Sequence, residues 1–426
     1  MAPIQDHPLR YKLANEIHAR PFPALASPAT GAFLALKEAE NASSRDREKD
    51  RRHLIKLLDR HGADHPSPGA THYYGRVGRY WLKWESHTEF VTYTAIAEGA
   101  GERPFDPADF EAFPEDWLED APGVRLTSAL IRIQEEPDPK AQSALIEDWF
   151  VSESLAVSAV VDGAATVASD FRIDPAGQMR FAVFTRPETG ARRIGRVVQR
   201  LCEIETYKAM SMLGFARVQS LDGRLREIDS ALLRLVETMS SGPMGSEATL
   251  KELLALSSEL ENMAAKAAFR FAATRAYEAI VTQRIDVLRE ERFDGRQTFS
   301  EFMMRRFDPA MRTVAATEQR IHEMSERSLR VGDLLRTSVD VERQAQNQKL
   351  LESMDKRADL QLRLQKTVEG LSVVAISYYA VNLVVYALGP VTEPLGFSTI
   401  VLFGLATPIT VLGVWWMVRR VRRSVE

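Results

Sequence analysis

Two long apolar runs lie near the end of a chain whose other segments mix apolar and polar residues. Residues 368–388 contain one charged residue, Glu369, and residues 397–418 contain none. Each run has about 20 residues, the length that an α-helix needs to cross the hydrocarbon core of a bilayer. Core helices of this length in water-soluble proteins keep a polar face, which these runs lack. The pattern therefore predicts two transmembrane helices.

Lysines and arginines around the two runs predict their orientation. Basic residues flank both outer ends of the pair, whereas the connection between the runs has none and carries one charge, Glu393. Because basic flanks stay in the cytoplasm, we expect a multi-pass protein of the bacterial inner membrane with both termini cytoplasmic. Tyr386, Trp415 and Trp416 lie where interfacial anchors are expected. The basic residues are Arg357, Arg363, Lys366, Arg419, Arg420, Arg422 and Arg423.

Upstream of the membrane runs, apolar residues recur three and four positions apart from about residue 190 onward. This spacing predicts long helices packed as a bundle or coiled coil. Gly- and Pro-containing breaks at residues 240–247 and 293–297 divide the region into three helices, and the third continues into the first membrane run. Asp308-Pro309 is expected to break or kink it. The seam residues are Val218, Leu221, Leu225, Ile228, Leu232, Leu235 and Met239; Leu250, Leu253, Leu260, Ala264, Ala267, Phe271, Thr274, Val281, Ile285 and Leu288; and Phe307, Met311, Val314, Ile321, Met324, Val331 and Leu335.

The seam of the third helix lapses at residues 342–349, which read ERQAQNQK. Two interpretations are open for this polar stretch. It is either exposed to solvent or the lining of a water-filled lumen between subunits.

The first 189 residues mix helix and strand patterns. Helices are predicted over residues 29–37 and 45–59, and aromatic or β-branched stretches predict strands. A proline-rich acidic stretch, residues 102–117, reads as a surface connection. The predicted strand regions are residues 79–97, 124–134, 155–173 with a turn at Asp162-Gly163, and 179–185.

These patterns together predict an α+β membrane protein of three parts. Residues 1–189 form an N-terminal α/β cytoplasmic domain, and residues 190–366 form a long helical stalk or bundle. Residues 367–426 form a transmembrane hairpin with a basic cytoplasmic tail.

Composition narrows the classes of function. The formal net charge is −4 and no basic face dominates, so we expect no nucleic-acid partner. The single cysteine, Cys202, excludes a disulfide framework and a CxxC pair, and its apolar helical neighbours indicate a core residue. Phosphate-loop, nucleophile-elbow and zinc-helix motifs are absent, so we expect neither an enzyme nor a cofactor. Residues 1–21 lack an apolar core segment, so no signal peptide is expected.

Two histidine-containing segments of the soluble part are candidates for ligand or metal binding. His18 and Arg20 could bind an anionic ligand or partner, or they fix a turn packed on the sheet beside two prolines. Glu85, His87 and Glu89 alternate, so a regular strand would place them on one face, where imidazole and carboxylate suit zinc or manganese. A hairpin turn at Ser86-His87 would instead separate them within a salt-linked surface. No metal is assigned with either pattern.

The chain resembles a known but uncharacterised family over nearly its whole length. The segments that carry the resemblance are NEIHARPFP (residues 15–23), WESHTEFVTYT (84–94) and VWWMVRR (414–420). The family consists of bacterial membrane-anchored proteins with a domain of unknown function, and it implies no activity.

The order of parts is similar to that of the CorA-type divalent-cation channel superfamily. The resemblance implies a homopentamer with a funnel-shaped cytoplasmic part and a pore lined by the first span. Those channels carry a Gly-Met-Asn motif at the end of that span, whereas this chain reads Tyr386-Ala387-Leu388-Gly389-Pro390. Only the glycine has a counterpart, so the resemblance names no particular ion.

A polar part of the first span is the candidate for an ion path. Tyr378 and Asn382 share a face by 3–4 spacing with Leu371, Ala375, Val385 and Gly389. Tyr378, Asn382, Gly389 and Tyr386 are the candidate pore-lining or interhelical residues. A buried amide in lipid needs a partner or water. In a symmetric oligomer, a ring of Asn382 would either hold helices together or face a pore. Glu393 would concentrate cations at the outer mouth, or it is an ordinary solvated carboxylate.

The leading expectation is therefore a homo-oligomeric inner-membrane protein that acts as a cation channel or transporter. Its expected partners are membrane lipid, further copies of itself, with a pentamer favoured, and cations. The alternative is a membrane-tethered scaffold whose cytoplasmic domain binds a partner and whose hairpin only anchors and oligomerises.

Overall fold

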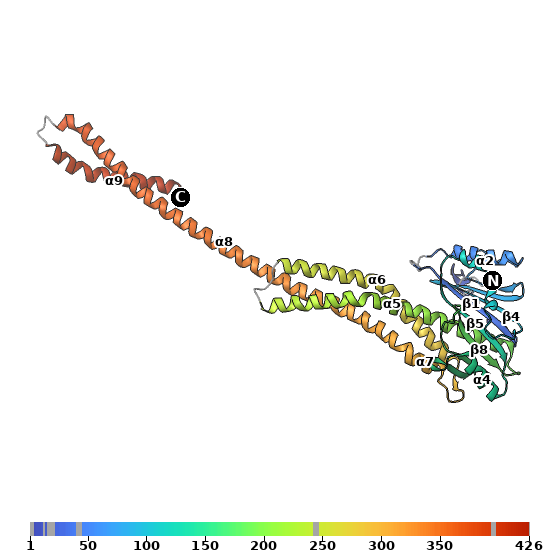
Figure 1. Ribbon diagram of the computed structural model, residues 1–426. Helices are drawn as coiled ribbons and strands as arrows, with labels where there is room; N and C mark the ends of the chain where they lie inside the picture. The colour runs from blue at the N-terminus through green and yellow to red at the C-terminus, as the bar shows by residue number, and fades with distance from the viewer. Residues whose placement is uncertain are drawn as a thin grey trace. The chain divides into compact units, whose positions relative to one another are not determined.

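The computed structural model describes residues 4–11, 13–14, 22–39, 45–241, 247–392 and 398–425, and Figure 1 shows their helices and strands. The chain divides into two compact units. The first comprises Met1–Glu237 and Glu252–Val331, and the second comprises Thr238–Lys251 and Gly332–Glu426. Both predicted membrane runs therefore belong to the second unit. The predicted three-part division at residues 190 and 367 stays a prediction.

A mixed sheet of nine strands organises the first unit. Its order is β2-β3-β4-β1-β5-β8-β7-β6-β9, and every neighbouring pair is antiparallel except β5 and β8, which run parallel. β1 pairs with β4 on one side and β5 on the other. The strands are β1 (Ala29–Lys37), β2 (His72–Val77), β3 (Tyr80–Ser86), β4 (Phe90–Glu98), β5 (Val124–Glu135), β6 (Ala156–Val160), β7 (Ala165–Ser169), β8 (Met179–Thr185) and β9 (Glu291–Arg292).

The two faces of the sheet have different covers. One face packs against α2 (Arg47–Arg60), the 3-10 helix η2 (Pro107–Ala112), α3 (Glu115–Glu119) and α4 (Pro139–Trp149), with Leu54, Trp117 and Ile146 fully buried in a common core. The other face packs against the start of α5 (Ala191–Ser241). Successive strand residues point to opposite faces, so the two covers require two sets of side chains from each strand.

The strand predictions for residues 79–97, 124–134, 155–173 and 179–185 are confirmed. The helix predicted over residues 45–59 is also confirmed and corresponds to α2. Asp162 and Gly163 form the predicted turn, with φ of 59° and 71°. The helix predicted over residues 29–37 is wrong, because this segment is β1. Eight of its nine residues are buried, so a strand covered on both faces shows no alternation. Its alanines and leucines then suggest a helix.

The segment at residues 102–117 is also more than the predicted surface connection. It holds η2 and part of α3, and its aromatic residues Phe105, Phe113 and Trp117 are 8%, 2% and 0% exposed. The prolines and acids lie outward while the aromatic residues enter the core. The acidic composition of the segment concealed this inner face.

Three long helices extend the first unit, and Figure 1 shows them side by side. They are α5, α6 (Glu247–Asp286) and the first part of α8 (Asp308–Thr392). Ion pairs tie them together: Arg224 to Glu259 at 2.6 Å, Arg320 to Asp229 at 3.2 Å, and Arg275 to Glu318. The short α7 (Phe299–Arg306) precedes α8, which confirms the predicted break beside Asp308-Pro309.

The predicted helix seams are almost entirely buried. On α5, Leu225, Ile228 and Leu232 are 0% exposed, and on α6 and α8 the seam residues are mostly below 9%. Leu250 and Ala264 are half-buried, and the side chain of Met239 lies outside the described residues. The 3–4 spacing therefore identified the packed faces of all three helices.

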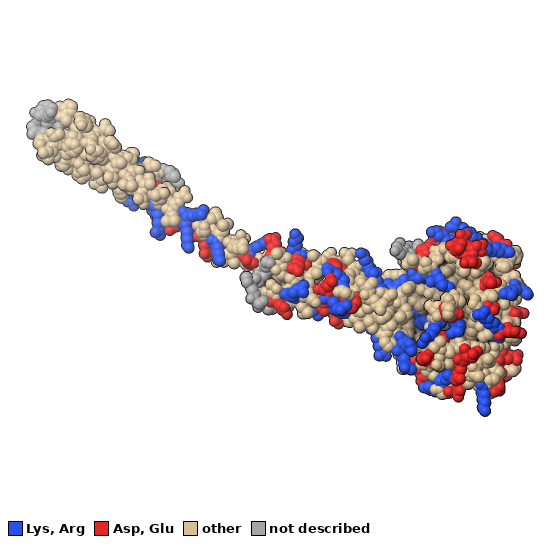
Figure 2. Space-filling model, viewed as in Figure 1, with Lys and Arg blue, Asp and Glu red and all other residues tan. Residues whose placement is uncertain are grey.

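Two helical stretches, Phe299–Pro390 and Thr399–Val421, are long and apolar enough to cross a membrane, by length and composition. The first stretch begins in the first unit and continues into the second, and the second stretch lies wholly in the second unit. The apolar end of α8 and α9 (Thr399–Val425) form a hairpin, hereafter the α8–α9 hairpin. Its small core joins Val381 and Val385 to Ala406. On the face that Figure 2 shows, the described part of this hairpin is mostly free of charged residues, in contrast to the mixed charges elsewhere.

Candidate functional site

The α8–α9 hairpin uses one side of α8 for packing against α9. Ser377, Val381 and Val385 are 5%, 7% and 6% exposed, and Ala406 of α9 is 8% exposed. Tyr378 and Asn382 follow Ser377 and Val381 by one residue, which is a rotation of about 100° around the helix. The polar residues therefore lie beside the packed side and not within it.

Tyr378 and Asn382 border the open flank of the hairpin. With Val373, Phe403 and Thr407 they line a mostly apolar groove between the two helices. Tyr378 is 67% exposed and Asn382 is half-buried. The Asn382 side-chain nitrogen donates to the Tyr378 carbonyl oxygen at 2.9 Å. One of the two amide donors of Asn382 is thus satisfied inside its own helix.

The other candidates in and beside the two apolar runs have different surroundings. Tyr386 is 82% exposed, and Gly389 is half-buried. Arg363 pairs with Asp359 at 3.1 Å, and Lys366 is exposed. Arg419 and Arg420 lie over the rings of Trp415 and Trp416, at 4.9 Å and 5.2 Å from their centroids. Glu393 and the side chains of Arg422 and Arg423 lie outside the described residues.

A stripe of residues at 3–4 spacing continues from the hairpin far back along α8, and we call it the α8 stripe. Its members from residue 350 to residue 378 are exposed in the single chain, with Leu350, Leu364 and Leu371 at 62%, 65% and 67% exposure, whereas Val385 packs against α9. Residues 342–368 of α8 are all exposed. The α8 stripe comprises Leu350, Met354, Arg357, Gln361, Leu364, Val368, Leu371, Ala375, Tyr378, Asn382, Val385 and Gly389.

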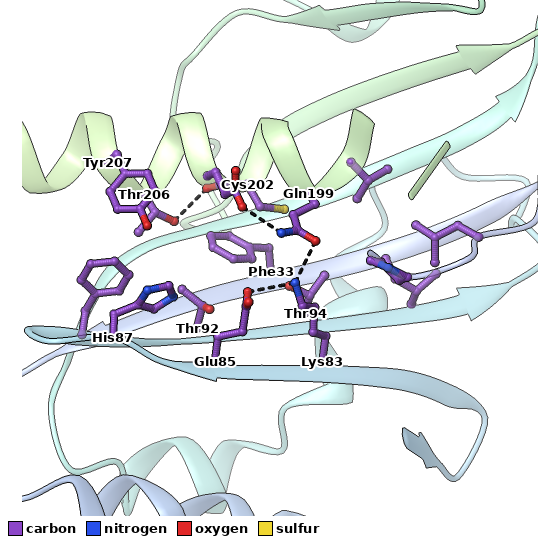
Figure 3. A pocket seen from close by; sticks show the side chains of 16 residues that line it. Phe33, Lys83, Glu85, His87, Thr92, Thr94, Gln199, Cys202, Thr206 and Tyr207 are labelled. Carbon is purple, nitrogen blue, oxygen red and sulfur yellow. Dashed lines mark hydrogen bonds and ion pairs between the residues drawn. The ribbon is translucent and has the colours of Figure 1, made fainter. Parts of the chain in front are cut away.

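The sheet contributes a second candidate, a cavity between β3, β4 and α5 (Figure 3). Lys83 and Glu85 point toward α5 and pair at 3.0 Å. The Lys83 ammonium also donates to Gln199 at 2.8 Å, and Gln199 donates to Glu203 at 2.8 Å. The free volume is about 30 Å³, room for about one or two water molecules. Lys83 and Glu85 are thus paired with each other, and Lys83 is bonded to α5, so the polar groups of this cavity form a structural network.

The predicted trio Glu85, His87 and Glu89 is divided by the hairpin turn between β3 and β4. Glu85 lies in β3, while His87 stacks on Phe90 with ring centroids 4.4 Å apart. Glu89 is 1% exposed, pairs with Arg270 and accepts a hydrogen bond from the Tyr277 hydroxyl at 2.8 Å. Within the described ranges, no three His, Cys, Asp or Glu side chains gather as a metal site.

Two further predictions concern residues near the same sheet. His18 and Arg20 lie outside the described residues. Cys202 is 5% exposed and lines the cavity, and burial raises the pKa of its thiol. A thiol in such surroundings is inert, which fits a core residue.

The sequence does not predict the residues that pair with Lys83 and Glu85, although it contains a pattern that indicates the positions of these two charged residues. In β3, Leu82 and Trp84 alternate with Lys83 and Glu85. That alternation could have predicted two charged residues on the face opposite the core. Their partners come from α5 and α6, more than a hundred residues away, and no local pattern announces them.

One family model matches the chain from residue 5 to residue 425, and its description is protein of unknown function DUF3422. No curated protein matches the sequence. Since the match covers nearly the whole chain, including the sheet, the long helices and both apolar runs, the chain belongs to the DUF3422 family.

Proposed function

We propose that the chain forms a membrane-embedded homo-oligomer in which α8 helices of neighbouring copies run parallel and line a path for cations. The observation that carries the proposal is the α8 stripe, which has no cover within the chain over most of its length. Such 3–4 stripes are the contact surfaces of parallel helices.

Leaving the part of the stripe that precedes the apolar run exposed to water forgoes free energy. Leu350, Met354 and Leu364 are each more than half exposed, and burying one such side chain contributes about 1.5–3 kcal/mol. Long helices also depend on tertiary packing for most of their stability. A second copy of α8 offers a matching surface, because the same residues recur at the same spacing.

Identical chains inserted in one membrane share one orientation, so their α8 helices run parallel. In-register copies would then meet stripe to stripe and bring equivalent residues into rings. Where the stripe enters the apolar region, these rings contain the Tyr378 hydroxyl and the Asn382 side-chain oxygen. Oxygen atoms of this kind replace part of the hydration shell of a cation. The CorA-like order of parts supports five copies.

The test is ion flux in liposomes. Wild-type protein should pass monovalent or divalent cations, and Asn382→Leu should reduce that flux strongly because it removes the only amide of the ring. Thr410→Val, on α9 and outside the groove lined by Tyr378 and Asn382, is the matched control and should leave the flux close to the wild-type value. Background-level flux from both wild type and Asn382→Leu would refute the channel.

A second function is a partner-binding scaffold whose hairpin only anchors and oligomerises. It is favoured by the bond between the Asn382 side-chain nitrogen and the Tyr378 carbonyl oxygen, because this bond satisfies an amide donor without pore water. Native mass spectrometry in detergent separates the two functions. A monomer or dimer supports the scaffold and excludes a pore between first spans, whereas a pentamer supports the channel.

A further inference from the structure

An arginine-rich pocket lies in the first unit, where the start of α5 meets the end of α6. It is an open cavity of about 500 Å³, and its lining includes Arg193, Arg196, Arg200 and Arg289. Asp286 is the one carboxylate among the described lining residues. The pocket is therefore strongly positive, and its size is that of a small-molecule site.

The two arginines at its mouth have no counter-charge. Arg193 and Arg196 are exposed, and among the described residues neither forms an ion pair. They also lie in the first two turns of α5, where the helix dipole disfavours positive charge. The first turn of α5 contains no acidic residue. Arg193 and Arg196 therefore lie where the dipole of their own helix disfavours their positive charge.

The other two arginines are fixed in place. The Arg200 guanidinium donates to the Val287 carbonyl oxygen at 2.9 Å, and the Arg289 guanidinium pairs with Asp162 at 2.7 Å. Burial lowers the pKa of Arg200, and the nearby positive charge of Arg196 adds to the effect. Four arginines therefore lie around one pocket, with Asp286 in its lining and Asp162 paired to Arg289 as the carboxylates near them.

Strained backbone accompanies this charge. Arg289 has a φ of 50° and Val161, which also lines the pocket, has a φ of 54°. A β-branched residue in the left-handed region is a genuine outlier. The Val161 amide donates to the Leu288 carbonyl oxygen at 2.7 Å, which holds the two strained segments together. Such strain persists where surrounding structure enforces it and gathers at ligand-binding sites.

We propose that this pocket binds a small phosphate-bearing anion. Guanidinium groups bind phosphate oxygens through paired hydrogen bonds, and four of them line this pocket, where Arg193 and Arg196 have no ion-pair partner among the described residues. None of the described lining residues is aromatic, so the phosphate charge and not a stacked base is recognised. The phosphate belongs either to a soluble molecule or to a lipid headgroup.

Inorganic pyrophosphate is the probe, titrated by calorimetry into the full chain in phosphatidylcholine nanodiscs at fixed ionic strength. We expect saturable binding by the wild type and an affinity lowered at least about tenfold in the double variant Arg193→Gln/Arg196→Gln. The matched control, Arg192→Gln/Arg312→Gln, removes two other exposed arginines of the first unit that lie outside the pocket. It should bind like the wild type.

Absence of saturable binding by the wild type would overturn the proposal, as would an equal loss in the control variant. Circular dichroism verifies that all variants are folded, and Arg200→Lys, which keeps the charge but loses the paired geometry, should also weaken binding. The source of the phosphate is decided by repeating the titration in nanodiscs that contain phosphatidic acid. Weaker pyrophosphate binding there identifies a lipid headgroup, and unchanged binding identifies a soluble anion.

Discussion

The seam residues of the long helices follow the same 3–4 spacing in both units, but those compared here are buried in the first unit and exposed in the second. In the first unit, Leu225 and Ile228 of α5 are 0% exposed, whereas Leu364 and Leu371 of the α8 stripe are 65% and 67% exposed. Spacing alone therefore does not tell which partner a seam will have. The first unit supplies its own cover, and we infer that lipid and further copies supply it for the second.

The largest expected effect is on assembly. Leu364→Glu places a charge in the α8 stripe and should dissociate the oligomer, because like charges would face one another at the contact. Leu362→Glu is the matched control: Leu362 is 57% exposed and lies two residues away, off the stripe. Light scattering in detergent measures the mass. Equal behaviour of the two variants would contradict the role of the stripe.

The next effect is on the stability of the first unit, where the ion pair between Glu89 and Arg270 is largely shielded from solvent. Glu89→Ala leaves Arg270, whose side chain is 16% exposed, without its carboxylate, which should cost about 3 kcal/mol of unfolding free energy. Glu98→Ala changes an exposed carboxylate at the far end of β4 and should stay within about 0.5 kcal/mol of wild type. Denaturant unfolding measures both.

Adding Arg270→Met to Glu89→Ala should recover part of the loss, because the unpaired charge is then removed. If Glu89→Ala and Glu98→Ala unfold alike, the buried pair does not stabilise the unit.

The unfolding free energy of the first unit should also depend on pH, through His53. His53 is 3% exposed, bonds to the Tyr93 hydroxyl at 3.0 Å and to the Trp117 carbonyl oxygen at 2.9 Å. Burial lowers its pKa from 6.5 to about 4. Between these values the unfolded chain binds more protons than the folded one, so unfolding free energy falls as the pH drops from 6.5 to 4.

The loss assigned to His53 is about 3 kcal/mol across that window. It is measured as the difference between wild type and His53→Phe in denaturant unfolding at pH 7 and pH 4. The variant keeps an aromatic ring beside Trp117 but does not titrate, so its profile should be flatter. Parallel profiles for the two proteins would show that His53 does not carry the effect.

The smallest effect concerns two glycines of α5. A Cβ at Gly214 would collide with the Thr274 side chain of α6, whereas a Cβ at Gly223 meets nothing within 4 Å. Gly214→Ala should therefore destabilise the helix crossing by about 1–3 kcal/mol. Gly223→Ala should stabilise α5 by up to about 1 kcal/mol, because alanine favours helices. Thermal unfolding that ranks the two variants the other way would contradict the close crossing.

The sequence was most informative where structure is local and periodic. The seams at Leu225, Phe271 and Met311, the breaks between the helices and the hairpin at Asp162-Gly163 all follow from nearby residues. β1 was mistaken for a helix because burial on both faces removes the alternation that identifies a strand. The strand order, which pairs β5 with β8 and β1 with β4, depends on contacts between distant segments.

The candidate sites likewise contain features that nearby residues predict and features that depend on distant segments. The separation of Glu85 from Glu89 follows from the hairpin that their neighbours predict. The partners of Glu89, Arg270 and Tyr277, are 181 and 188 residues away and have no local signature. The arginine-rich pocket is equally hidden, because it joins the start of α5, the end of α6 and the turn after β6.

Cysteine cross-linking tests the central claim most directly, with Cys202 replaced by alanine so that one thiol remains per chain. In-register parallel copies bring equivalent stripe residues together, so Leu364→Cys should form a covalent dimer on mild oxidation in membranes. Leu362→Cys, off the stripe, should remain monomeric on a non-reducing gel. No cross-link at position 364, or equal cross-links at both positions, would contradict the account.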